Sequence, residues 1–348
     1  MNIIFRPITA TDSASLRRLS HAAPDTGRIQ ISPDYHLDAY QSLLWTDPDN
    51  TSGFIAVQQQ PQDDIIGAGW ATSGHGLFNQ RQYPYTLLHN LVVHPEHRNK
   101  GIASELARRR IEHAQQSNPN TLILAFIQQG NNSSLAAAQK WSNHLAGSLT
   151  SGVVPVRSRP PRQQKKWVMR SPKPAEYVEI AEQLDSFYAD HDLYTPYTAD
   201  TLTNWLMESP FDTPYRHYRI VVDKNGKIAA GAAIIEQYRV KSMHIQHVPN
   251  AVRWLNKVIK LLPANNHLKP ISITKGWFAK DQKRAAQFLW ESMRWEWRQK
   301  ADVIFFMVDP RSPAADMIHA PFWLPSSHFH LACNQNDLLT GKRPIYTP

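Results

Sequence analysis

The chain has 348 residues, of which 42% are hydrophobic and 19% charged, so it can bury one or two cores and lacks the composition of a disordered protein. Its net charge of +9 suits an anionic ligand such as a nucleotide, but the basic residues are scattered and no nucleic-acid-binding motif accompanies them, which argues against a nucleic-acid partner. The single cysteine excludes a disulfide framework, and no apolar run reaches the roughly 20 residues of a membrane helix, so we expect a cytoplasmic protein without a membrane partner.

An internal repeat is the first feature along the chain. The stretch that contains Arg6 resembles the stretch around Arg170, and the stretch around Gly67 resembles the one around Gly231. The separation is 164 residues in both cases. Because a constant separation is the signature of a duplicated unit, the sequence predicts two copies of one fold.

The hydrophobic pattern gives both copies the same predicted layout. Each reads as a strand and a helix, then a hairpin, a further strand, a long amphipathic helix and another strand. Between the copies, residues 155–166 have the sequence PVRSRPPRQQKK, which predicts an exposed loop. We therefore expect one domain over residues 1–162 and a second over residues 163–348.

A short stretch of the first copy changes from an apolar strand to a helix within one tight turn. Residues 86–93, TLLHNLVV, have strand composition, and Pro95 favours a turn. A helix follows from Gly101, where the missing Cβ lets a ligand approach unpaired N–H groups. Arg98 adds a guanidinium, so this turn has the features of a phosphate site. Arg110 falls in the apolar half of the helix, and we expect its side chain to reach past that face to solvent.

These residues resemble the acyl-CoA-binding motif of the GNAT acetyltransferase superfamily, in which a Val-x-Pro turn is followed by Arg-x-x-Gly-x-Gly/Ala and an amphipathic helix. Here the motif reads Val93-His94-Pro95 and then Arg98-Asn99-Lys100-Gly101-Ile102-Ala103. Residues 121–141 resemble the family's next strand and its asparagine-containing turn. The resemblance implies an α/β (α+β) fold of two tandem GNAT-like domains, each with a mixed, mostly antiparallel, twisted sheet flanked by helices.

The resemblance also implies acetyl-CoA as the ligand of the first copy. The amides of the turn would hold the pyrophosphate, the end of the preceding strand would pair with the pantetheine arm, and the asparagine turn would lie near the thiol. The implied cofactor-binding residues are Leu91, Val92, Val93, Arg98, Asn99, Lys100, Gly101, Ile102, Ala103, Asn131 and Asn132.

Acetyl transfer to an amine calls for a base, because an amine with a pKa near 10.4 is only about one part in 10³ neutral at pH 7. Many members of the superfamily have a glutamate on the strand before the turn. Here His89 stands at that place with Asn90 beside it, and both are candidate catalytic residues. The family's tyrosine acid has no counterpart, since Lys140 and Trp141 stand near its position.

The second copy departs from the motif. Residues 271–291 contain no Arg-x-x-Gly-x-Gly/Ala, and Asp281 would repel a pyrophosphate. We therefore expect this copy to complete the sheet and to wall the acceptor pocket rather than to bind CoA. Tyr85 of the first copy and Tyr194 and Tyr197 of the second are candidate acceptor contacts.

No metal site is expected, because the histidine pairs 244/247 and 328/330 have no carboxylate or cysteine at ligand spacing. The sequence thus predicts an acetyl-CoA-dependent N-acyltransferase that transfers acetyl directly to a small-molecule or peptide amine through a ternary complex. It would act as a monomer that imitates a dimer, or as a homodimer. The alternative is a non-catalytic CoA-binding or sensing module that engages a protein partner, which the missing glutamate and tyrosine keep open. The identity of the acceptor is not readable from the sequence.

Overall fold

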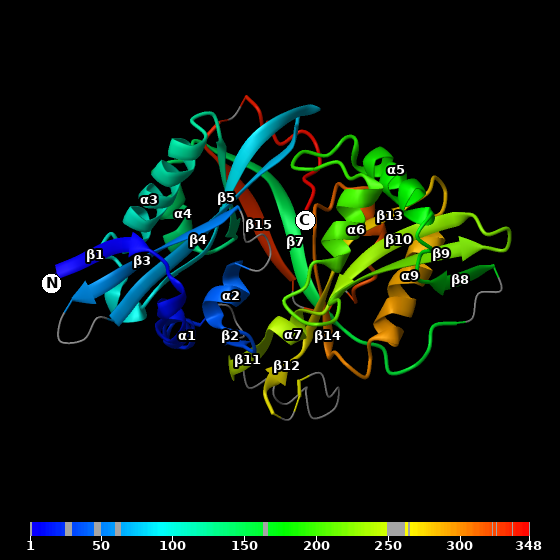
Figure 1. Ribbon diagram of the computed structural model, residues 1–348, viewed down its shortest axis with the longest axis horizontal. Coiled ribbons are helices and arrows are strands. Elements are labelled where there is room, and N and C mark those ends of the chain that lie inside the picture. The colour runs from blue at the N-terminus through cyan, green and yellow to red at the C-terminus, as the bar shows by residue number, and fades with distance from the viewer. Residues whose placement is uncertain are drawn as a thin grey trace.

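The computed structural model describes residues 2–347, except 25–29, 45–49, 60–63, 163–165, 249–261, 264, 322, 325 and 336. The described chain forms two halves that lie side by side along one long sheet (Figure 1). Among the described helices, none is both long and apolar enough to cross a bilayer.

The first half runs from the N-terminus to the strand that leads into the second half. Its elements are β1 (Asn2–Pro7), η1 (Ala10–Asp12), α1 (Ser13–Ala22), β2 (Gln30–Tyr35), α2 (Ala39–Leu44), β3 (Thr51–Gln59), β4 (Asp64–Phe78), β5 (Arg81–Val93), η2 (Pro95–His97), α3 (Ile102–Ser117), β6 (Leu122–Gln128), α4 (Asn132–Ala138) and β7 (His144–Pro155).

The second half repeats this order with an insertion after its second long strand. Its elements are β8 (Trp167–Arg170), α5 (Glu176–Tyr188), α6 (Ala199–Met207), β9 (Arg216–Asp223), β10 (Ile228–Ile235), α7 (Gln237–Val240), β11 (Lys241–His247), β12 (His267–Leu268), β13 (Pro270–Phe278), α9 (Lys283–Glu296), β14 (Val303–Val308), η3 (Pro313–Met317) and β15 (Ser326–Cys333).

A matching ion pair marks the same corner of each half. Arg6 at the end of β1 binds Asp12 with an N–O distance of 2.6 Å, and Arg170 at the end of β8 binds Glu176 at 2.6 Å. In both halves the carboxylate also accepts a hydrogen bond from the backbone N–H three residues before it. The two pairs are 164 residues apart, the separation expected from the internal repeat.

The halves share one sheet through exchanged strands. The order of its 12 strands is β1-β3-β4-β5-β6-β15-β7-β14-β13-β10-β9-β8. Strand β15 from the end of the chain thus lies between β6 and β7, while β7 pairs with β14 of the second half. The neighbours are antiparallel except for β5–β6 and β13–β14, which confirms the predicted fold class of mixed, mostly antiparallel sheets flanked by helices.

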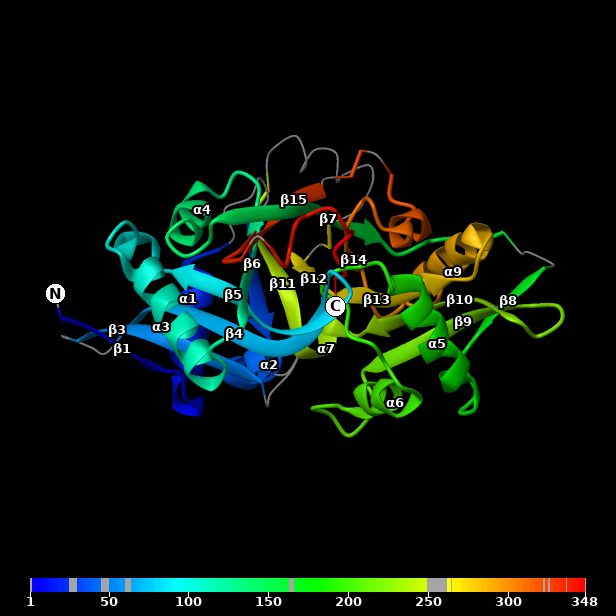
Figure 2. The ribbon, with the colours of Figure 1, turned by 90° about the horizontal axis from the view of Figure 1, so that it is seen from above.

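Helices cover both faces of the sheet in each half. Side chains of α1 pack with Ile55 and Val57 of β3, whereas Leu106 of α3 packs with Ala56 between them, so the two helices lie on opposite faces. In the second half α5 and α6 pack on one face and α9 on the other, as Figure 2 shows. The apolar positions of α3 and α9 recur every three or four residues, and this spacing explains their burial.

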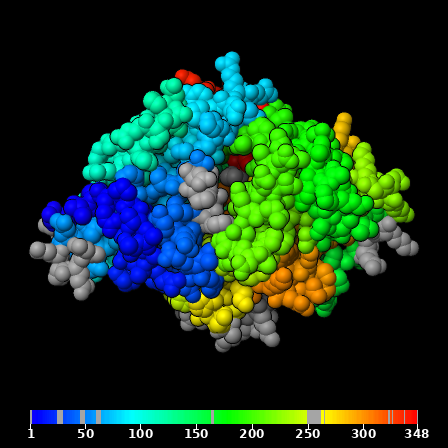
Figure 3. Space-filling model, in the orientation of Figure 1, coloured from blue at the N-terminus to red at the C-terminus, as the bar shows by residue number. Residues whose placement is uncertain are grey.

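Each half also reaches across to the other at the junction. The tip of the β4–β5 hairpin pairs with the loop after α5, where Leu77 N–H donates to the Tyr194 carbonyl at 2.7 Å. In return, β11 of the second half pairs with β2 of the first half. The surface is hollowed between the hairpin and the α5–α6 region (Figure 3). The second half therefore forms one wall of this hollow.

Candidate functional site

The parallel strands β5 and β6 separate after a short ladder. Their last residue pair is Leu87 with Leu124, whereas the opposite edge of β6 stays paired with β15 over residues 124–128. Within the described chain, residues 88–93 therefore have no strand partner on the β6 side. Such an edge offers N–H and C=O groups with which an extended ligand can pair. The sequence places Leu91, Val92 and Val93 at this edge.

A bulge in β5 is held by a buried arginine. Asn90 has a φ of +49°, and the register with β4 shifts between Ala68 and Trp70. A bulge leaves backbone groups outside the ladder. Arg110 binds two of them, since its Nη1 donates to the carbonyls of Trp70 at 2.9 Å and His89 at 3.4 Å. The expectation that Arg110 reaches solvent is therefore wrong: the side chain is 2% exposed, because the bulge supplies buried acceptors for it. Burial lowers the pKa of Arg110 to about 10, so it is protonated at pH 7.

The turn before α3 is open and rich in backbone donors. Asn99 and Gly101 have φ values of +61° and +80°, and nothing lies within 4 Å of the Cβ position at Gly101. Consecutive amides in such a turn face the same side, and the first turn of α3 adds its own free N–H groups and dipole. Arg98 is exposed and uses its Nε for the Val93 carbonyl at 3.2 Å, which leaves its terminal nitrogens for a ligand. Lys100, Ile102 and Ala103 complete the predicted turn.

The asparagine turn lies at a small cavity of about 150 Å³. Asn131 caps α4, because its Oδ1 accepts a hydrogen bond from the Ser134 N–H at 3.1 Å, and Asn132 is the first residue of that helix. Leu145 of β7 and His330 of β15 line the same cavity. The exchanged strands therefore bring the second half to the cofactor side of the first.

His89 lies inside a chain of hydroxyl groups. Its Nε2 is 2.9 Å from the Thr72 hydroxyl, which is 2.8 Å from the Thr51 hydroxyl. Burial lowers the pKa of His89 to about 4, and the positive charges of Arg110 and Lys241 act in the same direction. His89 is therefore neutral at pH 7 and has a low affinity for a proton, while its neighbour Asn90 is the exposed bulge residue.

The three predicted acceptor tyrosines have different surroundings. Tyr85 packs edge-on against Phe78, with ring centroids 6.1 Å apart. Tyr194 is 1% exposed and its hydroxyl donates to Asp185 at 2.6 Å, so the structure places it in the core rather than in an open pocket. Tyr197 is half-buried, and its hydroxyl accepts a hydrogen bond from Lys275.

Two residues of this region were not found by sequence reasoning. Thr72 comes from the middle of β4, where a threonine in a strand carries no signal. Lys241 begins β11, within the insertion that breaks the 164-residue separation of the repeat. A break in the 164-residue separation after Gly231 is the one sequence feature that could have pointed to this segment.

The corresponding opening in the second half is filled. Strands β13 and β14 part after Ser272 and Phe305, and Lys275 has a φ of +50°, like Asn90 in β5. However, the Sδ of Met317 from η3 lies 2.9 Å from the Cβ position at Gly276. The helix after this strand has Gln282 as its N-cap, with a φ of −103°, instead of a glycine.

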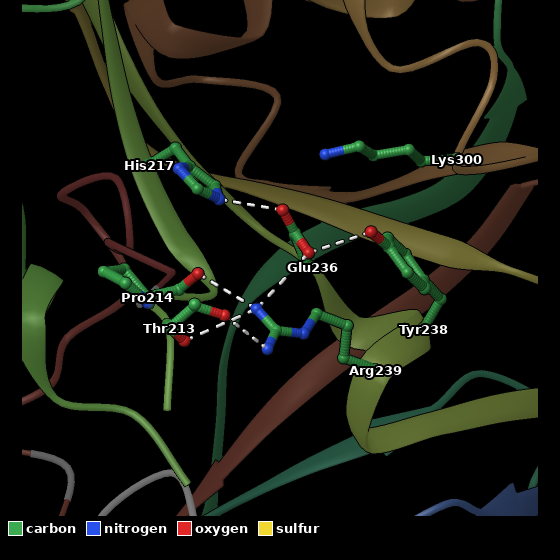
Figure 4. Close-up of a pocket in the computed structure, with 7 residues that line it drawn as sticks. All are labelled: Thr213, Pro214, His217, Glu236, Tyr238, Arg239 and Lys300. Carbon is green, nitrogen blue, oxygen red and sulfur yellow. Dashed lines mark hydrogen bonds and ion pairs between the residues drawn. The ribbon is translucent and has the colours of Figure 1, made fainter. Parts of the chain in front are cut away.

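A separate pocket of about 560 Å³ lies in the second half beside α7 (Figure 4). Its centre is the buried carboxylate of Glu236, which is 2.8 Å from His217 Nε2 and accepts a hydrogen bond from Tyr238 at 2.8 Å. Burial would raise the pKa of Glu236, but these hydrogen bonds hold it below its usual range. Arg239 donates to the carbonyl of Pro214 at 3.0 Å. The hydrogen bonds among these groups fix α7 against β9, whereas Lys300 lines the pocket without a hydrogen bond to any of them.

One side-chain cluster has the composition of metal ligands. The ligand atoms of His94, Glu96 and His97 lie within 4.8 Å of one another in the turn before α3. No metal was expected from the sequence, and these side chains lie at the partly exposed rim of the same turn that offers the phosphate donors.

Comparisons with known proteins show which family and which solved structures this chain is similar to. Residues 17–142 match the acetyltransferase (GNAT) family. In structure the chain is similar to N-myristoyltransferase of Saccharomyces cerevisiae with bound myristoyl-CoA, at 10% identity and a TM-score of 0.63 over 99% of this chain and 85% of that one. It is also similar to a GCN5-related N-acetyltransferase from Sphaerobacter thermophilus, at 14% identity and a TM-score of 0.62 over 95% of both chains.

The family match covers the segment that carries the open turn and the separated strands, and the structural likeness extends over both halves. A comparison with curated protein sequences finds no match. The first half of this chain therefore contains a domain of the acetyltransferase (GNAT) family, within a two-part GNAT fold.

Proposed function

We propose that the protein is an acetyl-CoA-dependent N-acyltransferase whose active site lies in the first half. The observation that carries this proposal is the opening between β5 and β6, which leads to the open turn at Gly101. The amides of that turn and the guanidinium of Arg98 would bind the pyrophosphate, and residues 91–93 would pair with the pantetheine arm. The cavity of about 150 Å³ beside Asn131 suits a short acyl group better than a long fatty chain.

The proposed reaction is direct transfer within a ternary complex. The amine nitrogen attacks the thioester carbonyl carbon, the new C–N bond forms, and the C–S bond breaks. The amine loses a proton, and the departing thiolate takes one up. A backbone N–H at the β5 edge would stabilise the oxyanion, because main-chain donors need no particular side chain.

The position of His89 limits its part in proton transfer. A group with a pKa of about 4 does not hold a proton at pH 7, so we propose that His89 passes the amine proton on to water through the Thr72 hydroxyl. Such a weak base favours an acceptor whose amine is already partly neutral at physiological pH. The positive φ of Asn90 forms the bulge, which would orient the following backbone N–H groups toward the ligand.

The second half would line one side of the acceptor site and would take the place that a second subunit has in a dimer. The filled opening beside Met317 supports a second half that binds no CoA. Because strands are exchanged between the halves, the proposed working unit is a single chain, and from the sequence we propose a cytoplasmic location.

The second candidate function is a CoA-binding module without turnover. It is favoured by the low pKa of His89 and by the lack of a tyrosine in α4, where the described residues are Asn132–Ala138. Release of free thiol from acetyl-CoA in the presence of an amine panel separates the two, because a sensor binds the ligand without consuming it.

The binding site itself is tested with a glycine pair. At a hundredfold excess over its dissociation constant, acetyl-CoA should stabilise the wild-type protein by about 2.7 kcal/mol. Gly101→Glu should abolish this effect, because it puts a carboxylate into the phosphate turn. Gly226→Glu is the matched control, since Gly226 has a φ of +82° with open space around it but lies in the β9–β10 turn. Equal ligand stabilisation of both variants would reject the assignment of the phosphate site.

A further inference from the structure

The second half places one lysine beside the proposed reaction site. We propose that Lys241 binds an anionic group of the acceptor, so that the substrates are amines that also carry a carboxylate or a phosphate. This inference rests on the proposed function and names the substrate class of the same site.

The position of Lys241 follows from the sheet that joins the halves. Strand β11 pairs antiparallel with β2, and Lys241 is opposite Tyr35 in that ladder. Tyr35 packs in the same core as Trp70, which is the β4 partner of His89. The charge of Lys241 accordingly acts on the His89 ring, although the two residues belong to different halves. Lys241 therefore approaches the proposed site from its second-half wall.

The ammonium of Lys241 has no partner among the described residues. Within the part of the chain that the structure describes, no carboxylate pairs with it and no group accepts a hydrogen bond from it. Burial alone acts on its pKa and lowers it, whereas a nearby carboxylate would have raised it. Lys241 is half-buried, so its ammonium has lost part of its hydration without gaining a counter-ion, and a ligand anion would supply the missing partner.

A fully buried lysine of the second half shows the contrast. Lys275 is 4% exposed, but its ammonium donates to the Tyr197 hydroxyl at 2.7 Å and lies 4.1 Å from the centre of the Trp205 ring. Lys275 is thus satisfied inside the protein by a hydroxyl and aromatic faces. Lys241 has neither kind of contact within the described chain.

The described charges around His89 have one sign. Among the described residues, the charged groups that act on its ring are Arg110 and Lys241, and no acidic group is found beside them. Arg110 is occupied by backbone carbonyls, which leaves Lys241 as the cation with free donors. A polyamine or an aminoglycoside would be repelled here, whereas an amine next to an anionic group would be attracted.

The test compares acceptors that differ by one charge. Amino acids and dipeptides, each paired with its C-terminal amide, together with phosphoethanolamine, spermidine and kanamycin, are assayed for acetyl transfer by intact-mass detection. The same compounds are titrated by calorimetry into protein saturated with CoA. We expect the anionic member of at least one pair to have a kcat/KM higher than its amide by about tenfold or more.

The variants separate a charge contact from a structural role. Lys241→Met should remove the preference for the anionic acceptor while leaving the KM for acetyl-CoA unchanged, and Lys241→Arg should retain most of the preference. Lys227→Met is the control, because Lys227 is an exposed lysine in the β9–β10 turn. Preference for amides or polyamines, or equal losses for both members of each pair in Lys241→Met, would overturn the proposal. Binding of acetyl-CoA with no binding of any anionic amine would overturn it as well, whereas failure of acetyl-CoA to bind would overturn the proposed function instead.

Discussion

The two halves build the same opening in their sheet and differ in what occupies it. In both, a parallel strand pair parts after three residue pairs, and a residue with positive φ follows, Asn90 in β5 and Lys275 in β13. In the second half, Met317 packs against Gly276 inside this opening. The shape of the sheet is therefore not sufficient for a cofactor site.

The turn that follows the strand differs as well. In the first half it contains Gly101 in a left-handed conformation, with open space around it. In the second half the helix starts after Gln282, which has a side chain and a negative φ. A few residues at one turn thus decide which half can offer its amides to a phosphate.

The largest effect on acetyl-CoA binding in this comparison is expected at the buried cation of the first half. Arg110→Met leaves the carbonyls of Trp70 and His89 without their donor, which should lower the free energy of unfolding by about 3 kcal/mol. The β5 edge should then lose its alignment, so acetyl-CoA should bind about tenfold more weakly. Urea unfolding and calorimetry measure the two effects.

The matched variant stands at the corresponding position of α9. Glu291 pairs there with Arg157 and Arg294 instead of holding a bulge. Glu291→Met should also destabilise the protein but should change the affinity for acetyl-CoA by less than about twofold, since the two sites share no partners. Equal losses of affinity in both variants would show that Arg110 acts only through global stability.

Truncation of Met317 tests what closes the opening in the second half. Met317→Ala should cost about 2–5 kcal/mol, because the side chain is 2% exposed. Met207→Ala, at a methionine that is 68% exposed, should cost less than about 0.5 kcal/mol. We expect calorimetry to give one acetyl-CoA per chain for both variants. A second binding event in Met317→Ala would mean that packing, rather than the missing glycine turn, excludes the ligand.

The local parts of the site could be predicted from the sequence. The strand before Pro95, the turn at Gly101 and the helix after it are short-range features, and their residue types fix backbone conformation directly. The repeat could also be predicted, because Arg6 and Arg170 have the same separation as Gly67 and Gly231.

The parts that depend on distant pairing could not be predicted. Nothing near β15 indicates that it lies between β6 and β7, because register between distant strands is set by the whole sheet. Arg110 was placed on the correct face of its helix, but the bulge that binds it belongs to other strands. Lys241 reaches the site only through the pairing of β11 with β2.

The smallest expected effect concerns the ion pair that occurs once in each half, Arg6 with Asp12 and Arg170 with Glu176. The hydrogen bond from Arg170 is the main cause that holds the pKa of Glu176 at about 2, and the same kind of bond from Arg6 lowers the pKa of Asp12. Because the folded pKa lies below an unfolded value near 4.3, this stabilisation is present above about pH 5 and disappears as the pH falls toward 2.

Glu176→Gln should therefore cost about 1 kcal/mol at pH 7 and nothing near pH 2, and Asp12→Asn should behave alike. Glu179→Gln removes a charge from the same first turn of α5 without breaking an ion pair, so its unfolding curve should follow the wild type at both pH values. A cost in Glu176→Gln that persists at pH 2 would show that packing, rather than the ion pair, fixes this corner.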